Sequence, residues 1–210
     1  MQIAFALYAG FTALDFVGPY QVLSNVPGVE VVLGAAEPGL VSDDNGLLHL
    51  QVASALADVT SPDIVVVPGG PAASTSGAIA DGALVTWLEK IHGSTTWTTS
   101  VCTGALLLGA AGILQGLKAT THWLSYDELA GYGATPTEQR VVVEGKVATG
   151  AGVSAGIDLA LTLVGLQWGE EVAQAIQLGI EYDPQPPYDA GAPSKAPAAI
   201  TELVTAVMRG

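Results

Sequence analysis

The sequence predicts an α/β fold with a mostly parallel sheet and helices on both faces. Short apolar or β-branched runs alternate with segments of helical spacing over most of the chain. The strongest strand signal, residues 63–67, ends in four consecutive apolar residues, which is typical of a strand buried on both faces. No internal repeat or linker interrupts this alternation, so we expect one domain over residues 1–210.

The first half of the chain predicts strands and helices in turn. Strands are expected at 3–8, 29–33 and 63–67, an edge strand or hairpin arm at 47–52, and helices at 16–23 and 82–91. The strand at 63–67 is closed by Pro68, Gly69 and Gly70, which predict a tight turn.

The second half continues the alternation. We expect a strand over 95–101, a hairpin over 140–149 turned at Glu144-Gly145, and helices at 103–109, 126–130, 154–166, 170–178 and 198–208. Ser154 is a plausible N-cap for its helix. The segment that begins at Pro184 is rich in proline and predicts extended chain.

Composition limits the classes of partner. The chain has 20 acidic and 6 basic residues, and its net charge of −14 would repel nucleic acid and anionic membranes. The apolar stretch 101–114 is too short to cross a bilayer, and the stretch 151–168 contains Asp158. The N-terminus lacks a signal-peptide pattern, and a single cysteine cannot form a disulfide within the chain. We expect a cytoplasmic protein.

The single cysteine, Cys102, lies where the predicted strand meets the predicted helix. A thiol there is near unpaired backbone N–H groups and the positive end of the helix dipole, which favour the reactive thiolate. Gly104 stands two residues later, as in a nucleophile elbow, although Ser100 takes the place of the earlier glycine. A buried structural cysteine is the alternative, and the strand–turn–helix setting favours the nucleophile.

Two further loops follow predicted strands, where ligands bind in open parallel sheets. Gly69 and Gly70, together with Thr103, could present backbone N–H groups to an anion, or they could form an ordinary turn. Asp15 could face Cys102 and exchange a proton, or it could cap the helix that follows it.

The histidines give weaker signals. His122 could activate the thiol, but a structural role is favoured. His49 and His92 fit an edge strand and a helix C-terminus, and their spacing suits no metal site. We therefore expect no metal and no organic cofactor. Ser154 and Asp158 are expected to cap and pack.

Three segments, 68–70, 100–104 and 119–123, together resemble the DJ-1/PfpI superfamily, whose fold is a flavodoxin-like sandwich. Within it, the segments 14–19, 102–104, 108–112 and 180–193 are similar to the isocyanide hydratase family. This resemblance implies a homodimer that adds water to a small-molecule isocyanide and gives an N-substituted formamide. It implies Cys102 as the nucleophile, through a covalent thioimidate, and Asp15 as the carboxyl group beside it.

The resemblance also suggests how the substrate is held. Thr103 would supply a backbone or hydroxyl contact, and Gly70 a backbone N–H. The apolar side chains of Phe16, Val153 and Trp123 would suit an apolar substituent on the isocyanide.

Other functions remain open at this point. Some relatives are cofactor-independent glyoxalases that usually rely on a glutamate and a histidine, so Asp15 weighs against that activity. Similar motifs occur in the sensor domains of AraC-type regulators, which leaves a thiol redox sensor, a metabolite sensor or a ligand-binding domain without catalysis as alternatives. Because the sequence ends at Gly210 with few basic residues, we expect an enzyme that does not bind nucleic acid.

Overall fold

The computed structural model describes residues 1–209, and its main feature is a seven-stranded sheet. The strands are β1 (Gln2–Ala6), β2 (Glu30–Ala35), β5 (Ser54–Ala55), β6 (Ile64–Val67), β7 (Trp97–Val101), β10 (Val141–Glu144) and β11 (Val147–Gly150). Their order across the sheet is β10-β11-β7-β6-β1-β2-β5, and only β10 and β11 pair antiparallel. The mostly parallel sheet that the sequence predicts is therefore confirmed.

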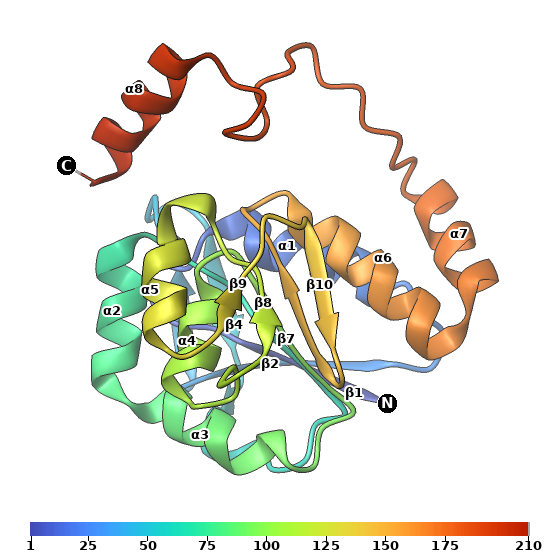
Figure 1. Cartoon of the computed structure of the whole chain (residues 1–210). Coiled ribbons are helices and arrows are strands. Elements are labelled where there is room, and N and C mark those ends of the chain that lie inside the picture. The colour runs from blue at the N-terminus through green and yellow to red at the C-terminus, as the bar shows by residue number, and fades with distance from the viewer. Residues whose placement is uncertain (210) are drawn as a thin grey trace.

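Helices cover both faces of this sheet (Figure 1). One layer contains α1 (Ala13–Leu23), α6 (Ala155–Trp168) and α7 (Glu170–Gly179). The opposite layer contains α2 (Ala72–Asp81), α3 (Ala83–His92), α4 (Gly104–Ala110) and α5 (Tyr126–Gly131). The main apolar core lies within these layers, and every residue of β6 is buried in it.

Short elements complete the body. They are the antiparallel hairpin of β3 (Gly39–Ser42) and β4 (His49–Val52), the parallel pair of β8 (Lys118–Ala119) and β9 (Thr135–Pro136), and the 3-10 turns η1 (Leu56–Asp58) and η2 (Trp123–Ser125). The hairpin arm expected at 47–52 is thus present. The hairpin predicted over 140–149 is also present, as β10 with β11, but it turns at Gly145 and Lys146, one residue later than predicted, and Gly145 has a φ of 60°.

Helix α2 has no counterpart among the helices that the sequence predicts. Its residues are mostly alanine, serine, threonine and glycine, so they give no apolar stripe at helical spacing. Thr75 is its only buried residue. Burial of a threonine rather than a leucine or valine explains why hydropathy does not reveal the helix.

Small residues let α1 and α6 pack closely. A Cβ added at Gly156 would lie 3.0 Å from Pro19 Cδ, and one added at Gly18 would lie 3.1 Å from Ile157 Cγ1. Both glycines are buried where the two helices meet. Close contact between α1 and α6 brings the first turn of each helix to the same edge of the sheet.

The last part of the chain stands apart from the body. Residues 183–197 contain no helix or strand and lead to α8 (Ala198–Arg209), which Figure 1 shows clear of both layers. From residue 177 to residue 208 no side chain is buried. Over residues 1–209, none of the helices is both long and apolar enough to cross a bilayer.

We expect Gly156→Val to lower the free energy of unfolding by roughly 1–3 kcal/mol, because the new side chain must push α1 away from α6. Urea denaturation measures this change. Gly77→Val is the matched control, since a Cβ at Gly77 meets nothing within 4 Å and valine is a better helix former than glycine. Equal stability of the two variants would contradict the close packing of these helices.

Candidate active site

Three neighbouring strands deliver the predicted site residues to one edge of the sheet. Asp15 lies in the first turn of α1, after β1, and Gly69 follows β6. Cys102 follows β7 directly. Because β1, β6 and β7 are adjacent and parallel, their carboxyl ends meet, as the sequence predicts.

Cys102 occupies a strained turn between β7 and α4. Its φ is 56°, in the left-handed region that side chains other than glycine rarely adopt. The turn is held by hydrogen bonds from Cys102 N–H to the carbonyl oxygens of Gly150 and Ala151, both at 3.0 Å, and from Thr121 Oγ1 to the Cys102 carbonyl at 2.8 Å. A Cβ at Gly104 would collide with the Val67 carbonyl oxygen, so glycine is required there. Strain held in place by several such contacts is common at functional sites.

Asp15 is completely buried, and its two carboxyl oxygens differ in their contacts. Oδ2 accepts a hydrogen bond from Gly69 N–H at 2.9 Å. Oδ1 makes no hydrogen bond of normal geometry with any residue that the structure describes. Burial raises the pKa of Asp15 to about 7, against the lowering effects of Gly69 N–H and of the Cys102 thiol, which are therefore neighbours of the carboxyl group. The position before α1 belongs to Thr12, so Asp15 does not cap this helix.

The thiol of Cys102 is also buried, and this corrects the expectation of a free thiolate. Burial and the charge of Asp15 raise its pKa to about 12. The N–H groups of Val153 and Thr103 and the Thr103 hydroxyl act in the opposite direction, but they do not outweigh burial. At neutral pH, the resting thiol therefore keeps its proton.

The expectation that Gly69 and Gly70 offer free N–H groups to an anion is wrong. Gly69 N–H is used by Asp15, and Gly70 N–H donates to Thr103 Oγ1 at 2.9 Å. The glycines matter for the space that they leave. A Cβ at Gly69 would lie 2.6 Å from Thr103 N and 2.8 Å from Asp15 Oδ2. Val153 and Thr103, rather than the two glycines, present N–H groups to the sulfur.

A group of buried hydroxyls holds the Gly69-Gly70 loop from behind. Thr103 Oγ1 donates to Gly70 O at 2.7 Å, and Thr75 Oγ1 donates to the same oxygen at 3.1 Å. Tyr8 OH donates to Pro68 O at 3.2 Å. Sequence reasoning missed Thr75 and the role of Tyr8, because neither lies in a motif and the helix that carries Thr75 was itself not predicted.

Two of the three apolar residues expected at the substrate, Phe16 and Val153, lie in different surroundings. The ring of Phe16 is buried in the core, 5.1 Å from the ring of Phe5 and 5.3 Å from that of Tyr20. This location does not support a substrate-binding role for Phe16. Val153 is partly exposed and packs in the same cluster as Cys102, so it remains a candidate to contact a substrate.

The histidines have local partners. Leu124 N–H donates to His122 Nδ1 at 3.4 Å, the His122 ring lies 5.7 Å from that of Trp123, and burial lowers the pKa of His122. His49 Nδ1 is 2.7 Å from a serine hydroxyl, and His92 Nδ1 is 2.9 Å from a threonine hydroxyl. Within residues 1–209, no three histidine, cysteine, aspartate or glutamate side chains are placed to hold a metal ion.

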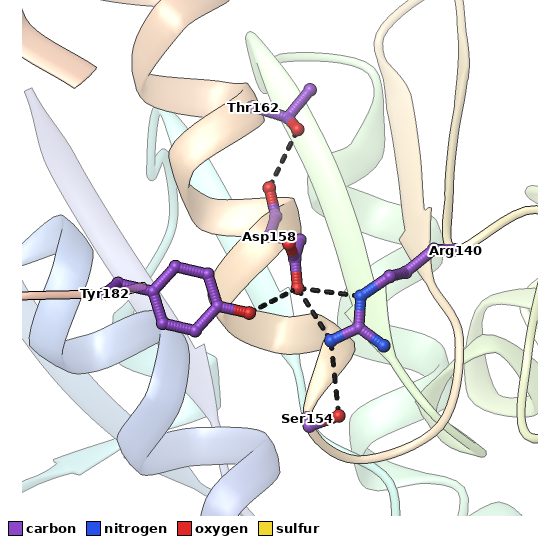
Figure 2. A network of polar contacts seen from close by, with 5 residues as sticks. All are labelled: Arg140, Ser154, Asp158, Thr162 and Tyr182. Carbon is purple, nitrogen blue, oxygen red and sulfur yellow. Dashed lines mark hydrogen bonds and ion pairs between the residues drawn. The ribbon is translucent and has the colours of Figure 1, made fainter. Parts of the chain in front are cut away.

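An ion-pair network lies beside the Val153 segment (Figure 2). Asp158 Oδ2 accepts from Arg140 Nη2 at 2.7 Å, from Arg140 Nε at 2.8 Å and from Tyr182 OH at 3.0 Å. Arg140 Nη2 also donates to Ser154 Oγ at 3.2 Å. Ser154 precedes α6 as predicted, but its side chain binds Arg140 and makes no cap. The network joins the start of β10, the start of α6 and the segment after α7.

Comparison with known proteins shows the family to which the chain belongs. A family model described as the DJ-1/PfpI family matches residues 1–166. The chain belongs to the DJ-1/PfpI family. Isonitrile hydratase of Pseudomonas putida is 41% identical over 202 residues, which cover 96% of this chain and 87% of that protein.

Two further relatives differ in how much of their own length the match covers. The crystal structure of a ThiJ/PfpI family protein from Pseudomonas syringae matches with a TM-score of 0.93 and 38% identity, and it covers 99% of this chain and 87% of that chain. An HTH-type transcriptional regulator of Pseudomonas aeruginosa is 29% identical over 178 residues, or 80% of this chain. The match spans only 51% of the regulator.

We expect Asp15→Asn to lower the pKa of the Cys102 thiol below about 12, because the variant removes the Asp15 charge and keeps a side chain of similar size. The pH dependence of iodoacetamide alkylation, followed by intact mass, measures this pKa. Asp81→Asn, at the exposed end of α2, is the matched control and should leave it unchanged. An unchanged or higher thiol pKa in Asp15→Asn would refute the electrostatic link between the two groups.

Proposed function

We propose that this protein is an isocyanide hydratase that converts an isocyanide and water into an N-substituted formamide. The observation that carries this proposal is the buried pair of Asp15 and Cys102, in which one carboxyl oxygen is held by Gly69 and the other makes no hydrogen bond of normal geometry. The 41% identity with isonitrile hydratase over 96% of the chain supports the same reaction.

In the first step, Cys102 Sγ attacks the terminal carbon of the isocyanide. Ionised Asp15 accepts the thiol proton as the S–C bond forms and delivers it to that carbon, whose lone pair takes it up. The product is a thioimidate bonded to Cys102. Because Asp15 has a pKa near 7, it can accept and release this proton at neutral pH.

In the second step, water adds to the carbon of the thioimidate. Asp15 removes a proton from the water as the C–O bond forms and passes this proton to the substrate nitrogen, so that Asp15 is ionised again. The C–S bond then breaks as the new hydroxyl becomes a carbonyl, and the hydroxyl proton returns through Asp15 to the sulfur. The formamide leaves, and the thiol and carboxyl groups are restored.

The remaining groups position the reacting pair. The N–H groups of Val153 and Thr103 stabilise negative charge on the sulfur during attack and release. Gly69 N–H keeps one Asp15 oxygen fixed, so the other faces the reaction. The balance of atoms and electrons requires only isocyanide and water, so we propose that no metal or organic cofactor takes part.

A thiol-based metabolite sensor is the second candidate function. The observation in its favour is the 29% identity with a transcriptional regulator. A sensor would bind or react once at Cys102 without repeated turnover, so multiple turnovers per chain separate the two functions.

We expect the purified protein to convert para-nitrophenyl isocyanide into the formamide with many turnovers per chain, as followed by absorbance and chromatography. Cys102→Ala should lose activity by at least about 10³-fold, because no covalent intermediate can form. Asp15→Asn should lose at least about 10²-fold, since proton transfer typically contributes that much.

Two exposed positions supply the controls for this assay. Ser61→Ala and Asp81→Asn should keep the full rate, because both residues lie outside the site. Absence of formamide from the unsubstituted protein would refute the hydratase function. Full activity of Cys102→Ala would refute the covalent route alone.

We expect kcat/KM for this substrate to rise with pH and to level off above about pH 7. Asp15 must be ionised to accept the thiol proton, and its pKa is near 7. Below that pH the carboxyl group is protonated and cannot act as the base, so the rate falls tenfold per pH unit. A rate that is flat between pH 5 and 9, or that falls as pH rises, would show that Asp15 is not this base.

A further inference from the structure

The edge of the sheet that holds Cys102 carries a second acidic residue besides Asp15. Asp15 lies beside the thiol, and its Oδ1 makes no hydrogen bond of normal geometry with any residue that the structure describes. The other carboxylate is that of Asp44, which is exposed on the loop that joins β3 to β4. The proposed reaction gives Asp15 a role and leaves Asp44 without one.

Asp44 is fixed next to the start of α1. Its Oδ2 accepts a hydrogen bond from Thr12 Oγ1 at 3.1 Å, and its N–H donates to Phe11 O at 2.9 Å. Thr12 N–H donates to Gly69 O at 2.8 Å, so the loop of Asp44 is tied to both segments that hold the site carboxyl group. Burial is the main cause of the raised pKa of Asp15, and the charge of Asp44 adds to it. The charge of Asp44 therefore acts inside the site.

Within residues 1–208, no basic side chain forms an ion pair with either carboxylate. Arg140 lies at this edge of the sheet, but Asp158 neutralises it. Lys146 donates to the carbonyls of His92 and Gly93 at the opposite edge, where β7 and β11 begin. The other basic residues are Lys90 in α3, Lys118 in β8, Lys195, which pairs with Asp189, and Arg209 at the end of α8. The site thus carries negative charge that no cation offsets.

We propose that Asp44 and Asp15 together restrict the site to isocyanides whose substituent is uncharged or cationic, with Asp44 as a specificity-determining residue. A carboxylate on the substrate would have to approach two like charges in a partly desolvated site, and this repulsion opposes binding. An uncharged substituent meets no such repulsion and can contact Val153, which is partly exposed. The inference names the substrate class of the proposed hydratase and so rests on that function, but the charge of the site can be tested without turnover.

Two alkylating reagents of nearly equal size test this charge directly. Iodoacetamide is uncharged and iodoacetate carries a carboxylate. Both react with the same Cys102 thiolate, so the ratio of their rates does not depend on the thiol pKa. At about pH 8.5 and low ionic strength, where Asp15 is ionised, we expect the ratio of the iodoacetamide rate to the iodoacetate rate to be at least about tenfold higher for Cys102 than for 2-mercaptoethanol, an uncharged thiol. Intact mass measures both rates on the protein.

Charge variants at position 44 assign this discrimination to Asp44. Asp44→Asn keeps the size of the side chain and an oxygen for Thr12, and it should lower the ratio about threefold, whereas Asp44→Lys should lower it about tenfold. Glu89→Gln is the matched control, because it removes one negative charge from an exposed position near the end of α3 and should leave the ratio unchanged. A Cys102 ratio equal to that of 2-mercaptoethanol, or Asp44 variants that behave as Glu89→Gln does, would overturn the proposal.

The substrate supplies a second test. We expect kcat/KM for para-isocyanobenzoate to be at least about tenfold lower than for para-isocyanobenzamide, which has the same shape without the charge, and Asp44→Lys should narrow this difference. Equal values for the two substrates would also overturn the proposal. If neither compound gives a formamide, the hydratase function fails, whereas the alkylation ratios still decide whether the site excludes anions.

Discussion

Close packing of backbone at the carboxyl end of β6 is the constraint on which the rest of the site depends. Gly69 and Gly104 leave gaps that a side chain would fill, and Asp15, Thr103 and the Val67 carbonyl occupy those gaps. The left-handed turn at Cys102 leads directly into α4, whose first residue, Gly104, lies against the Val67 carbonyl at the end of β6. A side chain at Gly69 or Gly104 would fill one of these gaps and push the segments that carry the Cys102 thiol and the Asp15 carboxyl group apart.

Burial, rather than the helix dipole, controls the ionisation of the site. α4 has only seven residues, and a helix N-terminus typically stabilises an anion by 0.3–1 kcal/mol. The rise in the Cys102 pKa from 9.0 to about 12 corresponds to about 4 kcal/mol against the thiolate. The effect of burial is the larger of the two, so at neutral pH the thiol keeps its proton, while Asp15, with a pKa of about 7, exchanges one readily. A buried pair of this kind favours reactions in which the proton and the nucleophile move to the same substrate atom.

The sequence predicts the fold well where the signal is local. Buried strands such as 63–67, the strand-to-helix position of Cys102 and the position of Asp15 beyond the end of the first strand all follow from hydropathy and spacing, although Asp15 lies within α1 rather than in the loop before it. Helix α2 and its Thr75 escape prediction because their burial involves small and polar residues, which leave no periodic pattern. The partners of the Gly69 and Gly70 N–H groups and the direction of the thiol pKa depend on contacts between distant segments, which spacing does not reveal.

The Asp158 network has a thermodynamic consequence. One carboxylate binds Tyr182, in the segment after α7, and through Arg140 it also holds the Ser154 side chain next to Val153. Linkage is reciprocal, so any free energy that couples the position of Tyr182 to the backbone beside the sulfur acts equally in both directions. A ligand that moved the Ser154 segment would then change how tightly Tyr182 is bound by the same amount by which displacement of Tyr182 would change the affinity for that ligand.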